Sequence, residues 1–448
     1  MITPYFAQLL SQADALYDQG EIAKGTELYV NLLQMGPEDP AVLNAVAVSL
    51  VQRGHTDNAI SLLEKALTIL PGDPGLLGNL RIANIKKAGF IKGIEDENTL
   101  TPLEKVSNRA KPNIIHLLPT SRCNLNCTYC GISGQASDHQ THQDMDTNVV
   151  EKILDLLGPL IGSTITLSGG EVTFMKDWMS LARRIKEKNF KISLISNFAK
   201  MFSDEEIAML ATFSTIAISM DSPDATITKH YRSKLRLEVL TLNIIRIRAY
   251  CLKHELPLPA LSIASTVGTP TLHTLPDLIT FAHACGVNKI SITDVTECAG
   301  APGDFTAIAR FDRYSRQESV NIFNETIRLA NRLGVELAVE QSTINALNGQ
   351  QSIETPPGLT KSCLDPWQML LFKPNGDIHS CCVDYPAIAN IRHVNSIEDI
   401  FFSEANLACK QTLLSGELHP ACKKCTRRQD KTADAFISEC QDFLQVTH

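Results

Sequence analysis

Three cysteines lie within eight consecutive residues of this chain and could hold a metal centre. The stretch SRCNLNCTYCG places Cys123, Cys127 and Cys130 at the spacing C-x3-C-x2-C. Thiolates this close together are typical ligands of zinc or of an iron–sulfur cluster, and both centres ordinarily take four protein ligands. The spacing therefore predicts a metal centre whose fourth ligand comes from elsewhere in the chain or is not a protein group.

Zinc is one interpretation of this segment, and it requires a nearby fourth ligand. The nearest histidines are His116, His139 and His142, and none stands at ligand spacing from the cysteines. Zinc sites usually draw their ligands at short, regular spacings. Zinc is therefore the weaker interpretation of this segment.

A second group of cysteines lies near the end of the chain, in the patterns C-x12-G-x4-C and C-x2-C. Two such pairs fit either a zinc ribbon or an iron–sulfur cluster. The predicted ligands are Cys363, Cys381, Cys422 and Cys425. Cys382 could replace its neighbour Cys381, and Cys440 could replace Cys363.

Six short apolar runs precede or separate these cysteine groups and predict the strands that position them. They cover residues 113–120, 163–169, 190–196, 215–221, 261–267 and 288–295. Amphipathic stretches such as DWMSLARRIKEKN alternate with them, which is typical of a parallel α/β sheet. Six units are two fewer than in a closed eight-unit barrel, so we expect a partial (β/α)6 TIM-like barrel, open on one side.

The first three cysteines directly follow the first run, so they are expected at the carboxyl edge of the sheet, where α/β proteins place their chemistry. From about residue 350 the βα rhythm ends. There MLLFKPNGDIHSCC contains Asn375-Gly376 between two alternating runs, which predicts a tight hairpin. We therefore expect a barrel domain over residues 112–349 and a small cysteine-rich domain over residues 350–448.

The N-terminal part of the chain repeats itself at one constant offset. The matched pairs are Ala13 with Ala47, Gly20 with Gly54, Gly25 with Ala59, Pro37 with Pro71, and Asp39-Pro40 with Asp73-Pro74. This offset resembles the period of the tetratricopeptide repeat, which predicts a helical domain over residues 1–90 with repeats at 6–39 and 40–73. Two unrelated helical hairpins are the alternative. A polar linker over residues 91–111 follows. Such repeats offer a groove for a peptide or protein partner.

The cysteine segment and the end of the second run together resemble the radical S-adenosylmethionine (SAM) superfamily. The shared features are C-x3-C-x-aromatic-C after the first strand and the glycine–glycine–glutamate motif of residues 169–171, which follows Ser168. In that family three cysteines hold a [4Fe–4S] cluster, and the amino and carboxylate groups of SAM chelate the fourth iron. The resemblance thus implies that the missing ligand is the cosubstrate.

The resemblance also implies which residues bind SAM. They are Tyr129, Ser168, Gly169, Gly170, Glu171, Ser196, Asn197, Ser219 and Arg232. Glycines let the backbone approach a ligand closely, a carboxylate can pair with the SAM ammonium, and a guanidinium suits its carboxylate. Tyr129 is expected near the adenine. Ser222 stands where relatives often have glycine, and a surface salt bridge is the alternative for Arg232.

The C-terminal cysteines resemble the SPASM-type extension of that family, which carries auxiliary iron–sulfur clusters. The full SPASM pattern continues with two further cysteines, and residues 426–433 contain none. We therefore expect one auxiliary [4Fe–4S] cluster. It could take an electron from a substrate radical, anchor a substrate, or brace the domain.

The activity implied by the resemblance is reductive cleavage of SAM to a 5′-deoxyadenosyl radical, which abstracts hydrogen from a substrate. The repeats favour a ribosomally made peptide or protein as substrate. The alternatives are dehydrogenation or epimerisation of a sugar or aminoglycoside-like molecule, and a non-catalytic metal-bound scaffold. A flavodoxin or ferredoxin is the expected electron donor. Whether SAM is consumed or regenerated is left open.

Glu297 and Cys298, which follow the sixth run, are further candidates for catalysis. Cys298 could donate a hydrogen atom to a substrate radical, and Glu297 could contact substrate or act as an acid or base. An ordinary buried or solvent-facing thiol is the alternative for Cys298. Cys251, Cys285 and Cys409 lie in helical patterns and are expected to be small core residues.

Composition limits the remaining classes. The 448 residues carry a net charge of −8, which argues against a general nucleic-acid binder. No run of 18 apolar residues indicates a membrane span, and the N-terminus does not resemble a secretion signal. Thirteen cysteines without such a signal favour metal binding over disulfides. A reducing cytoplasm is the expected location.

Overall fold

The computed structural model of the protein describes residues 3–87, 106–107, 109–132, 143–294, 314–347, 354–382, 385–425 and 427–444. The chain divides into two compact units, which are described separately. The first contains residues 1–95, 153–163 and 187–190. The second contains residues 96–152, 164–186 and 191–448. No helix in these described ranges is both long and apolar enough to cross a membrane.

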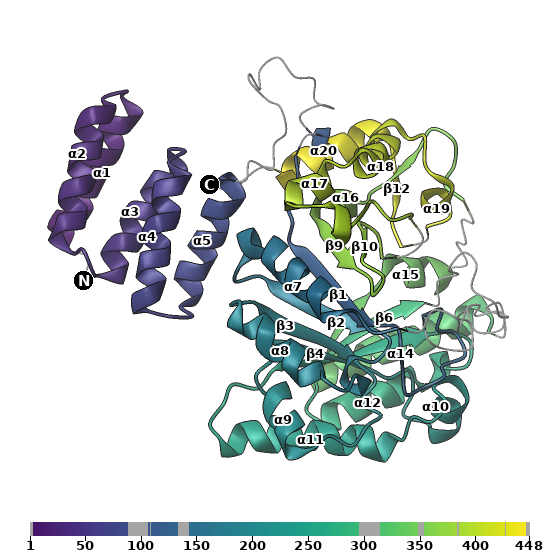
Figure 1. Ribbon diagram of the computed structural model, residues 1–448. Coiled ribbons are helices and arrows are strands. Elements are labelled where there is room, and N and C mark those ends of the chain that lie inside the picture. Colours follow the sequence, from purple (N-terminus) through teal and green to yellow (C-terminus); the bar gives the residue numbers. More distant parts are fainter. Residues whose placement is uncertain are drawn as a thin grey trace. The chain divides into compact units, whose positions relative to one another are not determined.

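The N-terminal region is helical, as predicted (Figure 1). Its helices are α1 (Pro4–Asp18), α2 (Ile22–Met35), α3 (Pro40–Gln52), α4 (Thr56–Ile69) and α5 (Pro74–Lys87). Thr3 and Asp39 cap α1 and α3 by accepting backbone hydrogen bonds, and a proline begins each of these two helices. Helix α1 packs against α2 and α3 against α4, around fully buried residues such as Leu32 and Leu63.

The helix boundaries follow the period seen in the sequence. Helix α2 begins at Ile22 and ends at Met35, and α4 begins at Thr56 and ends at Ile69. The first residues of the two helices, and also their last residues, are therefore separated by the offset of the sequence repeat. The same offset separates Pro74, which begins α5, from Pro40, which begins α3. The helices therefore repeat in position as well as in sequence. Their kinship with tetratricopeptide repeats stays a prediction.

The second unit is built on a ten-stranded sheet with the order β11-β10-β9-β1-β2-β3-β4-β5-β6-β7. The six predicted runs form β1 (Ile114–Thr120), β2 (Thr164–Gly169), β3 (Lys191–Ser196), β4 (Thr215–Ser219), β5 (Ala260–Val267) and β6 (Lys289–Asp294). These strands pair in parallel in chain order. The edge strands β11 and β7 do not pair with each other, so the sheet is an open, partial barrel.

Two parallel strands join the sheet beyond the six expected ones. Strand β7 (Glu336–Val339) pairs with β6, and β9 (Met369–Phe372) pairs with β1 on the opposite side. The predicted hairpin is confirmed, because β9 turns back antiparallel into β10 (Asp377–His379), which pairs with β11 (Ala389–Asn390). Gly376 has a φ of +87° in that turn, which suits glycine.

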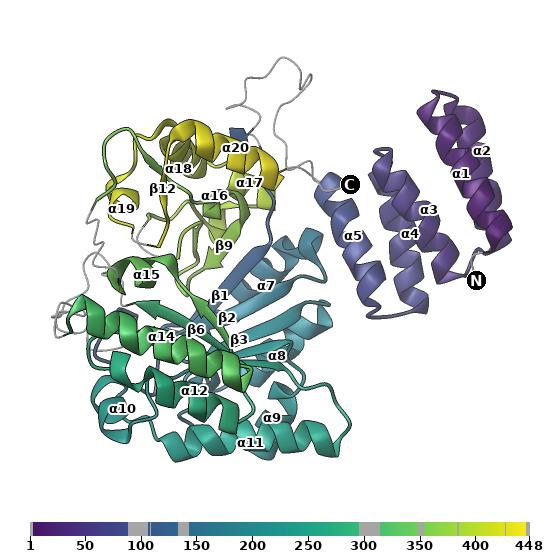
Figure 2. The same cartoon turned by 180° about the vertical axis from the view of Figure 1, so that it is seen from behind.

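The helices between the strands lie along the outside of the curved sheet (Figures 1 and 2). They are α7 (Thr147–Leu156), α8 (Trp178–Glu187), α9 (Asp204–Leu210), α10 (Ala225–Tyr231), α11 (Leu237–Lys253), α12 (Leu275–Ala284), α14 (Arg316–Leu333) and α15 (Gln341–Leu347). Side chains alternate along the strands. On β5, for example, Leu261 and Ile263 are buried and Ser262 is half-buried. The other face of β5 carries small and hydroxyl side chains, namely the half-buried Ser262, Ala264 and Thr266.

The C-terminal region has a hydrophobic core of its own. Its remaining elements are β8 (Thr360–Lys361), α16 (Asp365–Gln368), α17 (Ile397–Phe401), α18 (Glu404–Ser415), α19 (Pro420–Lys423), β12 (Asp430–Lys431) and α20 (Ala433–Leu444). Trp367 and Phe436 meet edge to face in the core, with ring centroids 5.9 Å apart. Cys409 and Cys440 are buried in the same cluster.

A fully buried lysine ties an upstream segment to this core. Lys410 on α18 donates hydrogen bonds to the carbonyl oxygens of Ser107, Arg109 and Phe401, at 3.3, 3.0 and 3.3 Å. The indole of Trp367 donates to the carbonyl oxygen of Val106 at 2.9 Å. The described end of the predicted linker is therefore packed into the C-terminal core, and residues 91–105 lie outside the described ranges.

Candidate functional site

The first three cysteines lie in the loop that follows β1, at the carboxyl edge of the parallel strands. Cys127 is buried, with 8% of its surface exposed, and Cys123 and Cys130 are half-buried. The backbone N–H of Thr128 donates to the carbonyl oxygen of Tyr231 at 3.1 Å, which ties the loop to the end of α10. The loop is therefore held by backbone contacts from a second element of the sheet edge.

The two glycines after β2 pack against the base of this loop. Gly169 has a φ of +113°, and a Cβ there would lie 2.6 Å from the carbonyl oxygen of Thr120. A Cβ on Gly170 would lie 2.1 Å from the carbonyl oxygen of Arg122. The N–H groups of Gly170 and Glu171 donate to these same two oxygens, at 2.9 and 2.8 Å. Only glycine allows the two turns to cross at this separation.

Glu171 joins the end of β2 to the end of β3. One carboxylate oxygen accepts from the hydroxyls of Ser196 and Thr173, at 2.8 and 2.5 Å, and from the Thr173 N–H. The other accepts from the backbone N–H of Asn197 at 2.7 Å. The residue is 1% exposed, and burial raises the pKa of its carboxyl group. Its expected contact with the SAM ammonium stays a prediction.

Asn197 brings the end of β3 to the cysteine loop. Its side-chain amide donates to the Asn124 side-chain oxygen at 2.9 Å and lies 3.6 Å from the Cys123 sulfur. Ser168 and Ser219 are half-buried at the ends of β2 and β4. The structure thus brings the predicted residues Gly170, Glu171 and Asn197, from the ends of β2 and β3, against one loop.

Tyr129 and Arg232 also meet at this edge, through an aspartate that the sequence analysis missed. Asp221 accepts hydrogen bonds from the Tyr129 hydroxyl and from the Arg232 guanidinium. Arg232 lies over the Tyr129 ring, 5.7 Å from its centroid. The available signal for Asp221 was its place as the acidic last residue of the fourth run, because strand ends at this edge carry functional groups.

The loop has the features that a bound iron–sulfur cluster requires. Burial raises the pKa of Cys127 to about 12, so this thiol needs a bound cation to ionise. The side-chain oxygens of Asn126 and Thr128 are buried without a hydrogen-bond partner. Among the described side chains, no three of His, Cys, Asp or Glu are placed to hold a single metal ion. A cubane needs its thiols farther apart than one ion does, because iron atoms lie between them.

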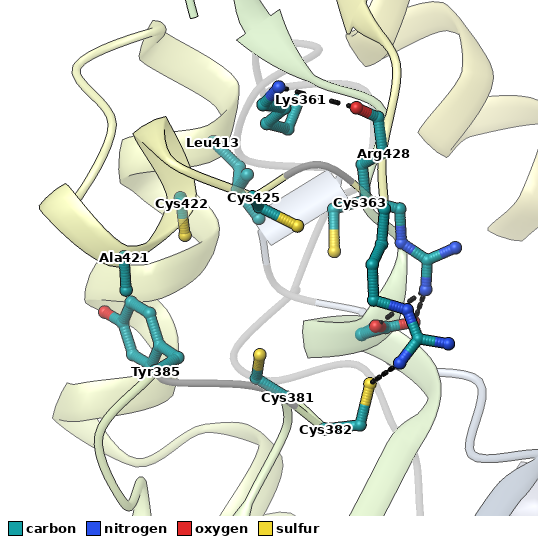
Figure 3. Close-up of a pocket in the computed structure, with 12 residues that line it drawn as sticks. Lys361, Cys363, Cys381, Cys382, Tyr385, Leu413, Ala421, Cys422, Cys425 and Arg428 are labelled. Atoms are coloured by element: carbon teal, nitrogen blue, oxygen red, sulfur yellow. Dashed lines mark hydrogen bonds and ion pairs between the residues drawn. The ribbon is translucent and has the colours of Figure 1, made fainter. Parts of the chain in front are cut away.

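The second cysteine group forms a pocket in the C-terminal region (Figure 3). Figure 3 shows the sulfur atoms of Cys363, Cys381, Cys422 and Cys425 turned toward one common space. Cys382 lines the pocket but turns to Arg427, whose guanidinium lies 3.5 Å from its sulfur. Cys440 is fully buried in the neighbouring core and does not line the pocket. This arrangement suits the four predicted ligands.

Paired charges surround this pocket. Arg428 donates to both oxygens of Asp365, each at 2.8 Å, and Lys361 pairs with Asp430 at 2.7 Å. Arg427 pairs with Glu340, which follows β7. Burial raises the pKa of Cys363 well above its usual range and that of Cys422 to about 12. These thiols, like Cys127, need bound metal to ionise.

The other candidate cysteines are placed as follows. Cys251 and Cys409 are buried in helices α11 and α18, as expected of small core residues. Cys285 is half-buried after α12. Cys298 and Glu297 lie outside the described residues, so their proposed roles in catalysis stay predictions.

Comparison with protein families agrees with this geometry. The model of the radical SAM superfamily matches residues 117–258, and that of the SPASM iron–sulfur cluster-binding domain matches residues 363–426. The two matches contain the two cysteine sites. The chain therefore carries a radical SAM domain and a SPASM domain. Its cofactors are SAM and two iron–sulfur clusters.

Individual relatives resemble parts of the chain. The PqqA peptide cyclase of Rhodopseudomonas palustris is 28% identical over 186 residues, 41% of this chain and 47% of that protein. A probable GTP 3′,8-cyclase of Pyrococcus abyssi is 31% identical over 121 residues, 27% of this chain and 38% of that protein. The chain thus spans less than half the length of these two curated relatives.

A solved structure resembles a larger part of the chain. Streptococcus suis SuiB superposes with a TM-score of 0.52 at 15% identity, covering 81% of this chain and 82% of that protein. SuiB bound to its precursor peptide SuiA superposes with the same TM-score and identity. At this identity the likeness shows the shared fold.

Proposed function

We propose that this protein cleaves SAM reductively and removes a hydrogen from a side chain of a ribosomally made peptide or protein. Bound SAM supplies the 5′-deoxyadenosyl radical that performs the abstraction. An external flavodoxin or ferredoxin in a reducing compartment such as the cytoplasm supplies the electron. The remaining steps fall to residues of this chain.

In this proposal Cys123, Cys127 and Cys130 hold the SAM-binding cluster. The turn after β2 lies directly against their loop, since the backbone N–H groups of Gly170 and Glu171 donate to oxygens at its base. In this proposal the substrate lies near this edge, on the face of the sheet where β5 carries Ser262, Ala264 and Thr266. In this proposal Cys363, Cys381, Cys422 and Cys425 would hold the auxiliary cluster, which would accept the electron that the substrate radical gives up.

The N-terminal helical region is the observation that carries the choice of a peptide substrate. It contains two successive helical hairpins of matched length, followed by a fifth helix. Stacked hairpins of this kind offer a groove that reads extended chains. Two relatives support the same choice. One is named a peptide cyclase, and SuiB has been solved with a bound precursor peptide.

The test is an anaerobic assay of the reconstituted full-length protein with SAM, a strong reductant and a panel of synthetic candidate peptides. We expect release of 5′-deoxyadenosine and loss of hydrogens from the peptide, both measured by mass spectrometry. A Cys127→Ala variant serves as the control and should give neither product. An unchanged peptide alongside steady SAM cleavage would overturn the proposed substrate but leave the chemistry in place.

A small-molecule substrate, such as a sugar or aminoglycoside, is the second candidate. The GTP 3′,8-cyclase relatives favour it, because their names specify a small substrate. Removal of residues 1–90 separates the two. An enzyme acting on a peptide should lose peptide modification and still cleave SAM, whereas an enzyme acting on a small molecule should keep its full activity.

A further inference from the structure

Asp221 lies just past the end of β4 and is buried, with 4% of its surface exposed. The guanidinium of Arg232 forms two hydrogen bonds with its carboxylate. Nε of Arg232 donates to Oδ2 at 2.7 Å, and Nη2 donates to Oδ1 at 2.7 Å. Such paired, charge-assisted bonds fix the plane of the guanidinium as well as its position.

Two further donors complete the environment of this carboxylate. The Tyr129 hydroxyl donates to Oδ2, and the backbone N–H of Thr266 on β5 donates to Oδ1 at 2.9 Å. A carboxylate accepts about four hydrogen bonds, so these four donors fill its capacity. Asp221 therefore acts through the groups it holds and has no acceptor left for a ligand.

Asp221 contacts only one edge of the Arg232 guanidinium. Both contacts come from Nε and Nη2, so the edge that carries Nη1 is available for a second anion. This guanidinium lies 5.7 Å from the Tyr129 ring centroid, and Tyr129 stands between the ligands Cys127 and Cys130 in the sequence. A backbone hydrogen bond joins Thr128, which precedes Tyr129, to Tyr231, which precedes Arg232.

We propose that Asp221 is a positioning residue that holds Arg232 and Tyr129 in place to receive SAM at the open position of the cluster. The Nη1 edge of Arg232 then faces the SAM carboxylate, and the Tyr129 ring borders the adenine. The inference rests on the proposed SAM-binding roles of these two residues. A buried ion pair is weak grounds for a purely stabilising role, because desolvation offsets much of its attraction.

Asp221→Asn tests this by removing the charge while keeping the shape. We expect the KM for SAM, measured from 5′-deoxyadenosine release without substrate, to rise about tenfold or more. A rise of this size corresponds to the loss of one strong charge-assisted contact. Iron content should stay at the wild-type level. The matched control is Asp224→Asn, three residues away, where asparagine can still cap α10 and the KM should not change.

Coupling between the residues gives a second readout. If Asp221 acts through Arg232 and Tyr129, the losses of SAM affinity caused by Asp221→Asn and Arg232→Lys should be less than additive in the double variant. The concentration of SAM that changes the electron paramagnetic resonance spectrum of the reduced cluster should shift in parallel with KM. Additive losses in the double variant would overturn the proposal.

A wild-type KM for SAM in Asp221→Asn would also overturn it. If that variant fails to fold or to hold its cluster, Tyr129→Phe decides, because it keeps the Asp221–Arg232 pair and removes only the hydroxyl contact. Unchanged SAM affinity in Tyr129→Phe would then refute the proposal, and weakened affinity would support it. All of these measurements omit peptide, so their outcome is independent of the proposed substrate.

Discussion

The two cysteine sites differ in how the chain assembles them. Cys123, Cys127 and Cys130 come from eight consecutive residues after one strand. The four thiols of the SPASM pocket come from three separate segments between residues 363 and 425. The first site depends on the backbones of neighbouring loops, and the second depends on a hydrophobic core that packs beside it.

The surroundings of the two sites differ in the same way. Around the first loop, buried oxygens of Asn126 and Thr128 lack partners, and Arg232 keeps one edge unused by Asp221. Around the SPASM pocket, each arginine and lysine that lines it is paired with a carboxylate. The first site is therefore suited to receive a ligand beside its cluster, and the second to enclose a cluster with four thiols.

The largest predicted effect follows from removing one thiol of the first site. Cys127→Ala should abolish 5′-deoxyadenosine release, because the cluster has only three cysteine ligands and loses one of them. Iron per chain should fall from about eight to about four, since the SPASM cluster remains. Anaerobic reconstitution with iron and sulfide analysis measures both.

Cys285→Ala is the matched control, because Cys285 is half-buried and belongs to neither site. It should keep both the iron content and SAM cleavage. Loss of all iron in Cys127→Ala would contradict the independence of the two sites.

A methyl group at Gly170 should damage the first site almost as severely. The added Cβ would lie 2.1 Å from the carbonyl oxygen of Arg122, so the loop must shift. Gly170→Ala should lower SAM cleavage by roughly a hundredfold, since small displacements of reacting groups cost that much. Cluster absorption and product release report the change.

Gly78→Ala is the control for this substitution, because nothing lies within 4 Å of a Cβ at that position in α5. Alanine there should leave SAM cleavage unchanged and stabilise the helix slightly. Normal activity in Gly170→Ala would show that the crossing of the two turns does not matter for the cluster.

The same contrast explains what the sequence could predict. The C-x3-C-x2-C spacing and the alternating runs of β1 to β6 are local patterns, so the strands and the first site were predicted from them. Strand β7 has only four residues, too few for a clear period. The pairing of β9 with β1 joins Met369 to Ile114, a separation in the chain that no local pattern records.

Within the site, local patterns identified residues but not their partners. Glu171 was picked out by its motif, but its hydrogen bonds from Thr173, Ser196 and Asn197 had no signal in the sequence. Asp221 and Tyr129 are 92 residues apart in the chain and meet only after folding. Lys410 gave no signal because a buried lysine is rare and its carbonyl partners are distant in sequence.

The choice of ligand in the SPASM pocket gives a smaller, more selective effect. Cys381→Ala should lose the auxiliary cluster, whereas Cys382→Ala should keep it, because only the Cys381 sulfur turns to the other three thiols in Figure 3. SAM cleavage without substrate should persist in both variants. Iron content and the spectra of the reduced proteins distinguish them, and equal iron loss in both would refute this assignment.

The smallest predicted effect is on stability and concerns the core beside the SPASM pocket. Lys410→Met should lower the unfolding temperature, because three buried carbonyl oxygens lose their donor. Burial lowers the pKa of Lys410 to about 7 in the folded protein, whereas an unfolded lysine titrates near 10.4. Between these values the unfolded chain binds a proton that the folded chain does not, so rising pH favours folding.

The stability difference between wild type and Lys410→Met should therefore be constant below pH 7 and widen toward about pH 10. Thermal unfolding of both proteins across this range measures it, with the exposed Lys65→Met as the control. A difference independent of pH would mean that Lys410 stays charged in the core, held by its carbonyl partners and the rings of Trp367 and Phe402.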